Sequence, residues 1–131
     1  MVESIVEPTM KEKFLQFLES RYRNTWLKPD KGKKTEVYLR KGIRRTPNSP
    51  VLQSLDIANF GAHLILAEVM EFLELAEGVK GKYDVIYLEN VDQHGLVGRL
   101  VLAGYHVHEL YSVRNQYVCL YKILPDPNLP S

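Results

Sequence analysis

Hydrophobic residues recur at two different periods in the first part of the chain, and each period predicts a different element. In residues 10–23 the apolar positions follow the spacing of an amphipathic helix, and Thr9 with Glu12 forms a capping-box pattern at its start. Residues 34–43 instead alternate apolar and polar side chains, which predicts a strand with one solvated face. Proline and glycine in residues 29–32 predict a turn between the two elements.

The central part of the chain alternates the two periods again. After an expected loop at 46–50, residues 51–60 form a mostly apolar run, which predicts a strand buried on at least one side. Residues 63–78 surround a narrow acidic stripe with apolar positions, so they predict a mostly buried helix that ends at Gly78. A short run of β-forming residues predicts the next strand at 83–90.

The last part predicts a shorter helix and a hairpin. Asp92 is expected to cap the helix, and Gly104 lies at its C-terminal end. Alternating segments at 105–113 and 117–124, joined at 114–115, predict the hairpin. This order of elements predicts an α/β fold with a mixed sheet, in which the strand–helix–strand part is parallel and helices pack on the faces of the sheet.

Length and composition bound the class of protein. With 131 residues, of which 45% are hydrophobic, we expect a single domain over residues 1–124, followed by a disordered tail at 125–131 that contains three prolines. No apolar run reaches the roughly 18 to 20 residues that cross a bilayer, and residues 1–9 lack the pattern of a signal peptide. A cytoplasmic protein without membrane segments is expected. The single cysteine, Cys119, is expected to be buried.

Charge is distributed unevenly along the chain, although the formal net charge is only +1. Residues 21–45 contain ten Lys or Arg and two acids, whereas residues 46–93 contain eight acids and two lysines. The basic stretch also contains Tyr22, Trp26 and Tyr38, which could stack on bases while the cations contact phosphates. One hypothesis is therefore a non-enzymatic module that binds nucleic acid or an acidic protein. The alternatives are a solvated sheet edge protected by lysines, and a homodimer in which this stretch faces the acidic helix of a second copy.

A resemblance to a known family supplies the other functional hypothesis. The order strand, buried helix, strand, shorter helix, Gly-aromatic and hairpin is similar to that of the GNAT N-acetyltransferases, and the closest stretches are Leu55–Asn59, Val85–Asn90 and Gly104-Tyr105. The resemblance implies a three-layer arrangement, with a central mixed sheet and helices on both faces. It also implies transfer of an acetyl or acyl group from CoA to a small-molecule or peptide amine, with acetyl-CoA as the donor, or a relative that has kept the fold and lost this chemistry.

The resemblance places a cofactor site after the first of these strands. In the family a loop of the type Gln/Arg-x-x-Gly-x-Gly/Ala and the helix after it hold the pyrophosphate, whereas the corresponding loop here is shorter and has no basic residue. The residues expected to contact the cofactor are Phe60, Gly61, Ala62, His63, Asn90 and Gly95. Asn90 could instead cap the following helix, and Gly95 with Gly98 could instead allow close packing against another backbone.

Two carboxylates are candidates for accepting a proton from the attacking amine. Asp56 and Glu89 lie on the strands that the resemblance places beside the cleft, and direct attack by an amine needs such a base. Both could instead lie at solvated strand ends or pair with the basic stretch. Leu100 occupies the position of the tyrosine with which the family often protonates the departing thiolate.

His106 and His108 lie on one face of a predicted strand. Two imidazoles with this spacing can bind a metal, but at least one further ligand is needed, and the sequence places none beside them. We therefore expect structural roles for both histidines and predict no metal site.

Overall fold

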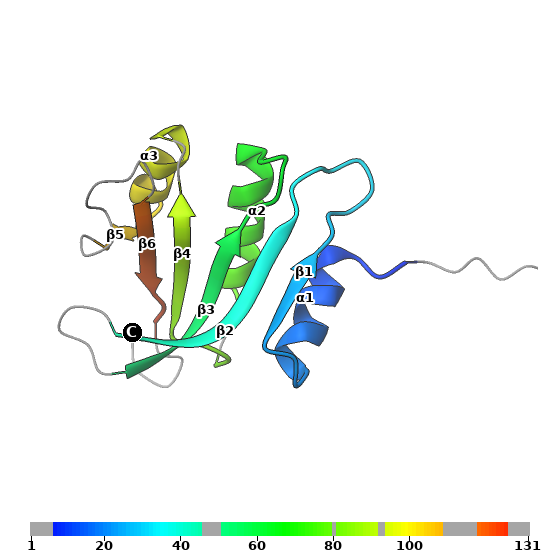
Figure 1. Ribbon diagram of the computed structural model, residues 1–131, viewed down its shortest axis with the longest axis horizontal. Coiled ribbons are helices and arrows are strands. Elements are labelled where there is room, and N and C mark those ends of the chain that lie inside the picture. Colours follow the sequence, from blue (N-terminus) through cyan, green and yellow to red (C-terminus); the bar gives the residue numbers. More distant parts are fainter. Residues whose placement is uncertain (1–6, 46–50, 80, 92–93, 109–117, 126–131) are drawn as a thin grey trace, which may run out of the picture.

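The computed structural model describes residues 7–45, 51–79, 81–91, 94–108 and 118–125, and Figure 1 shows their arrangement. The helices are α1 (Met10–Glu19), α2 (Leu66–Glu77) and α3 (His94–Leu102). The strands are β1 (Asn24–Leu27), β2 (Val37–Arg45), β3 (Val51–Asn59), β4 (Val85–Val91), β5 (His106–Val107) and β6 (Val118–Ile123). From β3 onward, the order of elements is the one expected from the sequence.

The strands form one mixed sheet in the order β1-β2-β3-β4-β6-β5. Neighbouring strands are antiparallel except for β3 and β4, which are parallel because the connection through α2 returns the chain to the same end of the sheet. The parallel register runs from Ser54 opposite Val85 to Ile57 opposite Leu88. The predicted mixed sheet, with a parallel strand–helix–strand unit, is confirmed.

The helices of the described residues cover one face of the sheet rather than both. Buried residues of α1, α2 and α3 belong to a single apolar cluster with one set of alternate strand residues: Leu39, Leu55, Ile57, Ile86, Leu88 and Leu120. In Figure 1, α2 lies behind β3. The expectation of helices on both faces is therefore wrong for this part of the chain. The physical reason is that the opposite face carries charged residues of β2, β3 and β4, and a face interrupted by charges is a poor surface for a helix.

Helix α1 begins as predicted and ends earlier than predicted. The Thr9 hydroxyl accepts the Glu12 N–H at 3.1 Å, which confirms Thr9 as the cap, and it donates to the Glu12 carboxylate, which thus contacts the hydroxyl of Thr9. At the other end, Ser20 is extended, and its hydroxyl donates to the Phe17 carbonyl at 2.7 Å. This contact ends the helix at Glu19, and the chain then forms β1, a short strand that the helical pattern of residues 10–23 concealed.

The C-terminal part keeps the predicted pairing within its described residues. Gly104 follows α3 with a φ of 98°, and Tyr105 N–H donates to the Leu100 carbonyl at 2.9 Å, so the glycine ends the helix as expected. Strands β5 and β6 are antiparallel, and Cys119 on β6 is buried. The loop at 46–50, Asp92, the turn at 114–115 and residues 126–131 lie outside the described residues.

A glycine inside α3, Gly98, and the glycine that follows the helix, Gly104, predict stability changes of opposite sign. Gly98→Ala places a Cβ on an exposed helical position where no atom lies within 4 Å, so the free energy of unfolding should rise by about 0.5 to 1 kcal/mol. Gly104→Ala forces an L-residue to a φ of 98° and should lower it by about 1 kcal/mol. Urea unfolding measures both values, and a destabilised Gly98→Ala variant would contradict the prediction.

Candidate functional site

The parallel pairing of β3 with β4 stops before either strand ends. Its last pair joins Ile57 to Leu88. Beyond this pair, β3 still pairs with β2 through Asn59, and β4 still pairs with β6 at Val91. The carboxyl ends of the two strands therefore part, as their arrowheads do in Figure 1. In open sheets with parallel strands, ligands bind beyond such carboxyl ends.

Two arginines of β2 bridge the point at which β3 and β4 part. Arg40 and Arg44 each contact the carboxylate of Asp56 on β3 and the Oε1 atom of Glu89 on β4. The distance from Nη2 to Asp56 Oδ2 is 3.0 Å for Arg44 and 3.4 Å for Arg40. Alternate residues of neighbouring strands share one face, and these four side chains lie on the face opposite the helices. The structure thus brings both candidate carboxylates together with part of the basic stretch.

The Asp56 carboxylate is buried, and both of its oxygens are occupied. Oδ1 accepts the Ser54 hydroxyl at 2.8 Å and Arg44 Nε at 3.3 Å, while Oδ2 accepts from both arginines. Gly42 makes room for this arrangement, because a Cβ at that position would lie 2.9 Å from Asp56 Oδ2. A charge is stable at a buried position only when it is paired and hydrogen-bonded, and Asp56 satisfies both conditions.

Glu89 is held by the same arginines but remains more accessible. Its side chain is 20% exposed, and the arginines contact Oε1 only. Within the described residues Oε2 has no hydrogen-bond partner. The pKa of Arg44 reflects the same contacts: burial alone would lower it, but the hydrogen bond to Asp56 and the charges of Asp56 and Glu89 raise it above its ordinary value. Of the two candidate bases, Glu89 is the one with an oxygen available to a ligand.

Two buried aromatic residues, Tyr87 and His108, lie beside Arg44. The guanidinium carbon of Arg44 lies 4.1 Å from the centroid of the Tyr87 ring, a cation–π contact. The Tyr87 hydroxyl and His108 Nδ1 are 2.7 Å apart. Burial and the Arg44 charge lower the pKa of His108, which favours the neutral imidazole. In the part of the chain that the structure describes, no group of three or more His, Cys, Asp or Glu could hold a metal ion.

The loop between β3 and α2 lies at the edge where the strands part. It contains four of the predicted cofactor contacts, of which Phe60 is buried whereas Gly61, Ala62 and His63 are exposed. Gly61 has a φ of 72°, and its N–H already donates to Asn59 Oδ1 at 2.8 Å. A Cβ on Gly61 would lie 3.3 Å from the Cβ of Glu36, so an acidic side chain is its neighbour. The loop therefore offers few donors to an anion.

The first turn of α2 carries an acidic side chain, Glu68. The Glu68 carboxylate accepts the backbone N–H groups of Lys34 and Thr35 at 2.9 and 2.8 Å, and these hydrogen bonds lower the pKa of Glu68. Ile65 N–H donates to the Thr35 hydroxyl at 2.8 Å. Because acids lie near both the loop and the helix start, the described residues do not fit a bound pyrophosphate.

The second loop at this edge leads from β4 into α3. Asn90 lies near the end of β4, and Gly95 lies in the first turn of α3. Among the described residues, a Cβ on Gly95 or Gly98 would meet no atom within 4 Å, so these residues give no support to close packing against another backbone. In this part of the chain, the α3 face that carries Gly95 and Gly98 is open to a ligand.

Contacts within the domain use much of the basic stretch. Four of its ten basic residues form ion pairs: Lys28, Lys33, Arg40 and Arg44. Lys41 donates to the Ser20 carbonyl and lies over the Phe17 ring. The stretch therefore leaves fewer cations for phosphates than its composition indicates, and this disfavours the nucleic-acid hypothesis.

Sequence reasoning proposed the two carboxylates but missed their partners. Arg40 lies on the polar face of the strand predicted at 34–43, and Arg44 lies four positions later, one residue beyond its predicted end, so the alternation places them together only if the strand continues. The sequence does not give the register that sets Arg40 opposite Asp56, nor the role of Gly42.

Comparisons with protein-family models, with curated proteins and with solved structures yield no significant match to this chain. Of the helices in the described residues, none combines the length and the apolar character needed to cross a membrane.

Loss of the Asp56 charge should weaken the fold strongly. Asp56→Asn leaves two guanidiniums beside a buried amide, and we expect a loss of about 2 to 3 kcal/mol, because breaking a buried pair costs about 3 to 5 kcal/mol and these arginines are partly hydrated. Glu19→Gln is the matched control, since its ion pair with Lys82 is exposed and should contribute less than about 1 kcal/mol. Equal effects in urea unfolding would show that the cluster does not stabilise the sheet.

Proposed function

We propose that this chain is a GNAT-like N-acyltransferase in which ligands enter between the parted carboxyl ends of β3 and β4. The observation that carries the proposal is the early end of the parallel pairing at Ile57 and Leu88, with both strands continuing beyond it. The strand–helix–strand–helix order and the position of both predicted cofactor loops at this edge support it. The proposal includes the family's central sheet but not its helices on both faces, which the described residues do not have.

The acyl donor, acetyl-CoA, would be held mainly through the extended part of the molecule that carries its amide groups. Between the parted strands no cross-strand backbone pairs occur beyond Ile57 and Leu88, so backbone groups there are available to an extended ligand that carries amides. The loop at Gly61 and the start of α2 have acidic neighbours and do not fit the pyrophosphate. Acetyl-CoA would supply the activated acyl group, and weak recognition of its phosphates is expected.

Glu89 is the proposed proton acceptor for the attacking amine. Its Oε1 is fixed by Arg40 and Arg44, and Oε2 is the oxygen that remains for the amine. Asp56 has both oxygens engaged, so its role would be to position the arginines that orient Glu89. Glu89 and Asp56 are thus given different roles, whereas the sequence offers both as candidates for the same base.

Thiol release from acetyl-CoA in the presence of a panel of primary amines tests the proposal. The wild-type chain should release CoA faster than the amines do unaided, and Glu89→Gln should reduce the rate about 100-fold, because a positioned base contributes about 100- to 10,000-fold. Glu74→Gln, an exposed glutamate on α2, is the matched control and should keep the wild-type rate.

Circular dichroism of each variant separates lost chemistry from lost structure. A wild-type rate equal to the background with every amine would refute the enzymatic proposal, and an unchanged rate in folded Glu89→Gln would remove Glu89 from the proposed role.

A further inference from the structure

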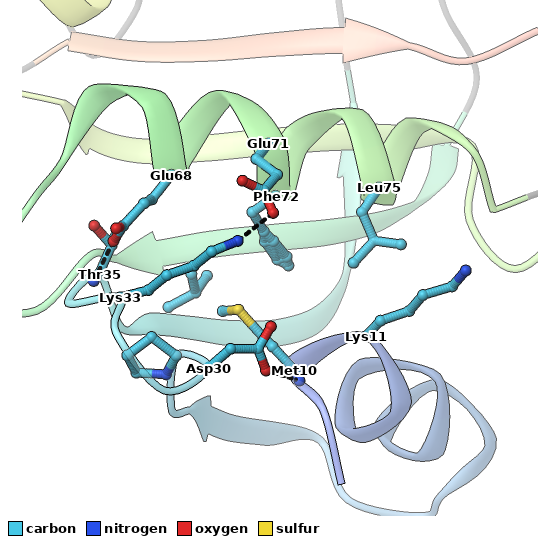
Figure 2. A pocket seen from close by; sticks show the side chains of 11 residues that line it. Met10, Lys11, Asp30, Lys33, Thr35, Glu68, Glu71, Phe72 and Leu75 are labelled. Atoms are coloured by element: carbon cyan, nitrogen blue, oxygen red, sulfur yellow. Dashed lines mark hydrogen bonds and ion pairs between the residues drawn. The ribbon is translucent and has the colours of Figure 1, made fainter.

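A cavity of about 190 Å³ lies between α1, the turn that precedes β2, and α2. Figure 2 shows it with its lining side chains. Its floor is apolar and is formed by Met10, Val37, Phe72 and Leu75. An engineered apolar cavity of about 150 Å³ holds benzene, so this one has room for a ring with one or two further atoms.

The packing of α1 explains why this space is left open. Phe14 of α1 meets Phe72 of α2 edge-on, with ring centroids 5.2 Å apart, and this contact fixes where α1 lies on α2. The other side of the cavity is bounded by the turn around Asp30, which is held against α1 by a hydrogen bond of 2.7 Å from Met10 N–H to Asp30 Oδ1. The cavity is the space over Phe72 between this turn and α2.

The rim of the cavity is charged, and acids outnumber bases. Asp30, Glu68 and Glu71 line it together with Lys11 and Lys33. Each carboxylate has one engaged oxygen: Asp30 accepts Met10 N–H, Glu68 accepts two backbone N–H groups, and Glu71 accepts the Lys33 ammonium. Glu68 also interacts with the Thr35 hydroxyl, whereas the second oxygens of Asp30 and Glu71 have no hydrogen-bond partner among the described residues.

The two lysines do not cancel this excess. Lys33 is committed to Glu71 across the opening, and the same ion pair raises the pKa of Lys33. Figure 2 shows the Lys11 side chain directed away from Asp30 and from the Lys33–Glu71 pair. A cation that enters the cavity therefore meets the open oxygens of Asp30 and Glu71, whereas an anion meets a rim with one acid in excess.

We propose that this cavity binds a small amine, with its apolar body on Phe72 and its ammonium group at the rim in place of the Lys33 ammonium. The site does not depend on the proposed acyltransferase activity, since it shares no residue with the parted ends of β3 and β4. Affinity should be modest, with a Kd on the order of 1 mM for a ligand of about eight heavy atoms.

Three probes of matched shape test the charge of the ligand: benzylammonium, benzyl alcohol and benzoate. Amide NMR titration of the whole chain should show saturable shifts of residues around Phe72 with benzylammonium, at least tenfold tighter than with benzoate, and with benzyl alcohol between the two. Shifts of equal affinity for all three, or no saturable shift with benzylammonium, would overturn the proposal.

Two rim substitutions should change the benzylammonium affinity in opposite directions. Lys33→Met removes the internal competitor for Glu71 and should tighten binding about threefold, whereas Glu71→Gln removes an acceptor and should weaken it about threefold, as expected for an exposed ion pair. Lys31→Met and Glu74→Gln are matched controls for the change in net charge and should leave the affinity unchanged. Equal effects in rim and control variants would show general electrostatics rather than a site, and would refute the proposal.

Discussion

The buried Asp56 carboxylate is the constraint on which much of this structure depends. It lies on the sheet face that carries no described helix, so its charge must be neutralised by side chains of the sheet itself. Arg40 and Arg44 provide this neutralisation, and Gly42 provides the space for it. Helices pack against the apolar face of a sheet. A face that carries paired charges is a poor surface for a second helical layer.

The same cluster determines what the parted strands can do. Backbone pairing between β3 and β4 ends at Ile57 and Leu88, and beside this point Arg40 and Arg44 connect Asp56, the residue before the last pair on β3, to Glu89, the residue after it on β4. Ion pairs thus connect β3 and β4 near the ends at which the backbone hydrogen bonds between these strands have stopped. Glu89 gains a fixed position and, within the part of the chain that the structure describes, keeps one oxygen without a partner; these are the properties that a base needs.

Local patterns predicted most of the elements, because capping and periodicity are local properties. Thr9, Gly78 and Gly104 marked helix ends correctly, whereas the boundary at Ser20 was missed because apolar spacing continued past it. The two carboxylates could also be selected from the sequence. Their pairing could not, because it depends on the register that sets Arg40 opposite Asp56, and register is a property of the folded sheet.

The central claim is that ligands enter where β3 and β4 part, and amide NMR during titration with CoA tests it most directly. The account predicts that shifts gather on residues 58–63 and on residues 89–91 and 94–98, at the two loops of this edge, while the edge strand β1 stays unchanged. Shifts confined to β1 or to the basic stretch, or no shifts at millimolar CoA, would contradict it.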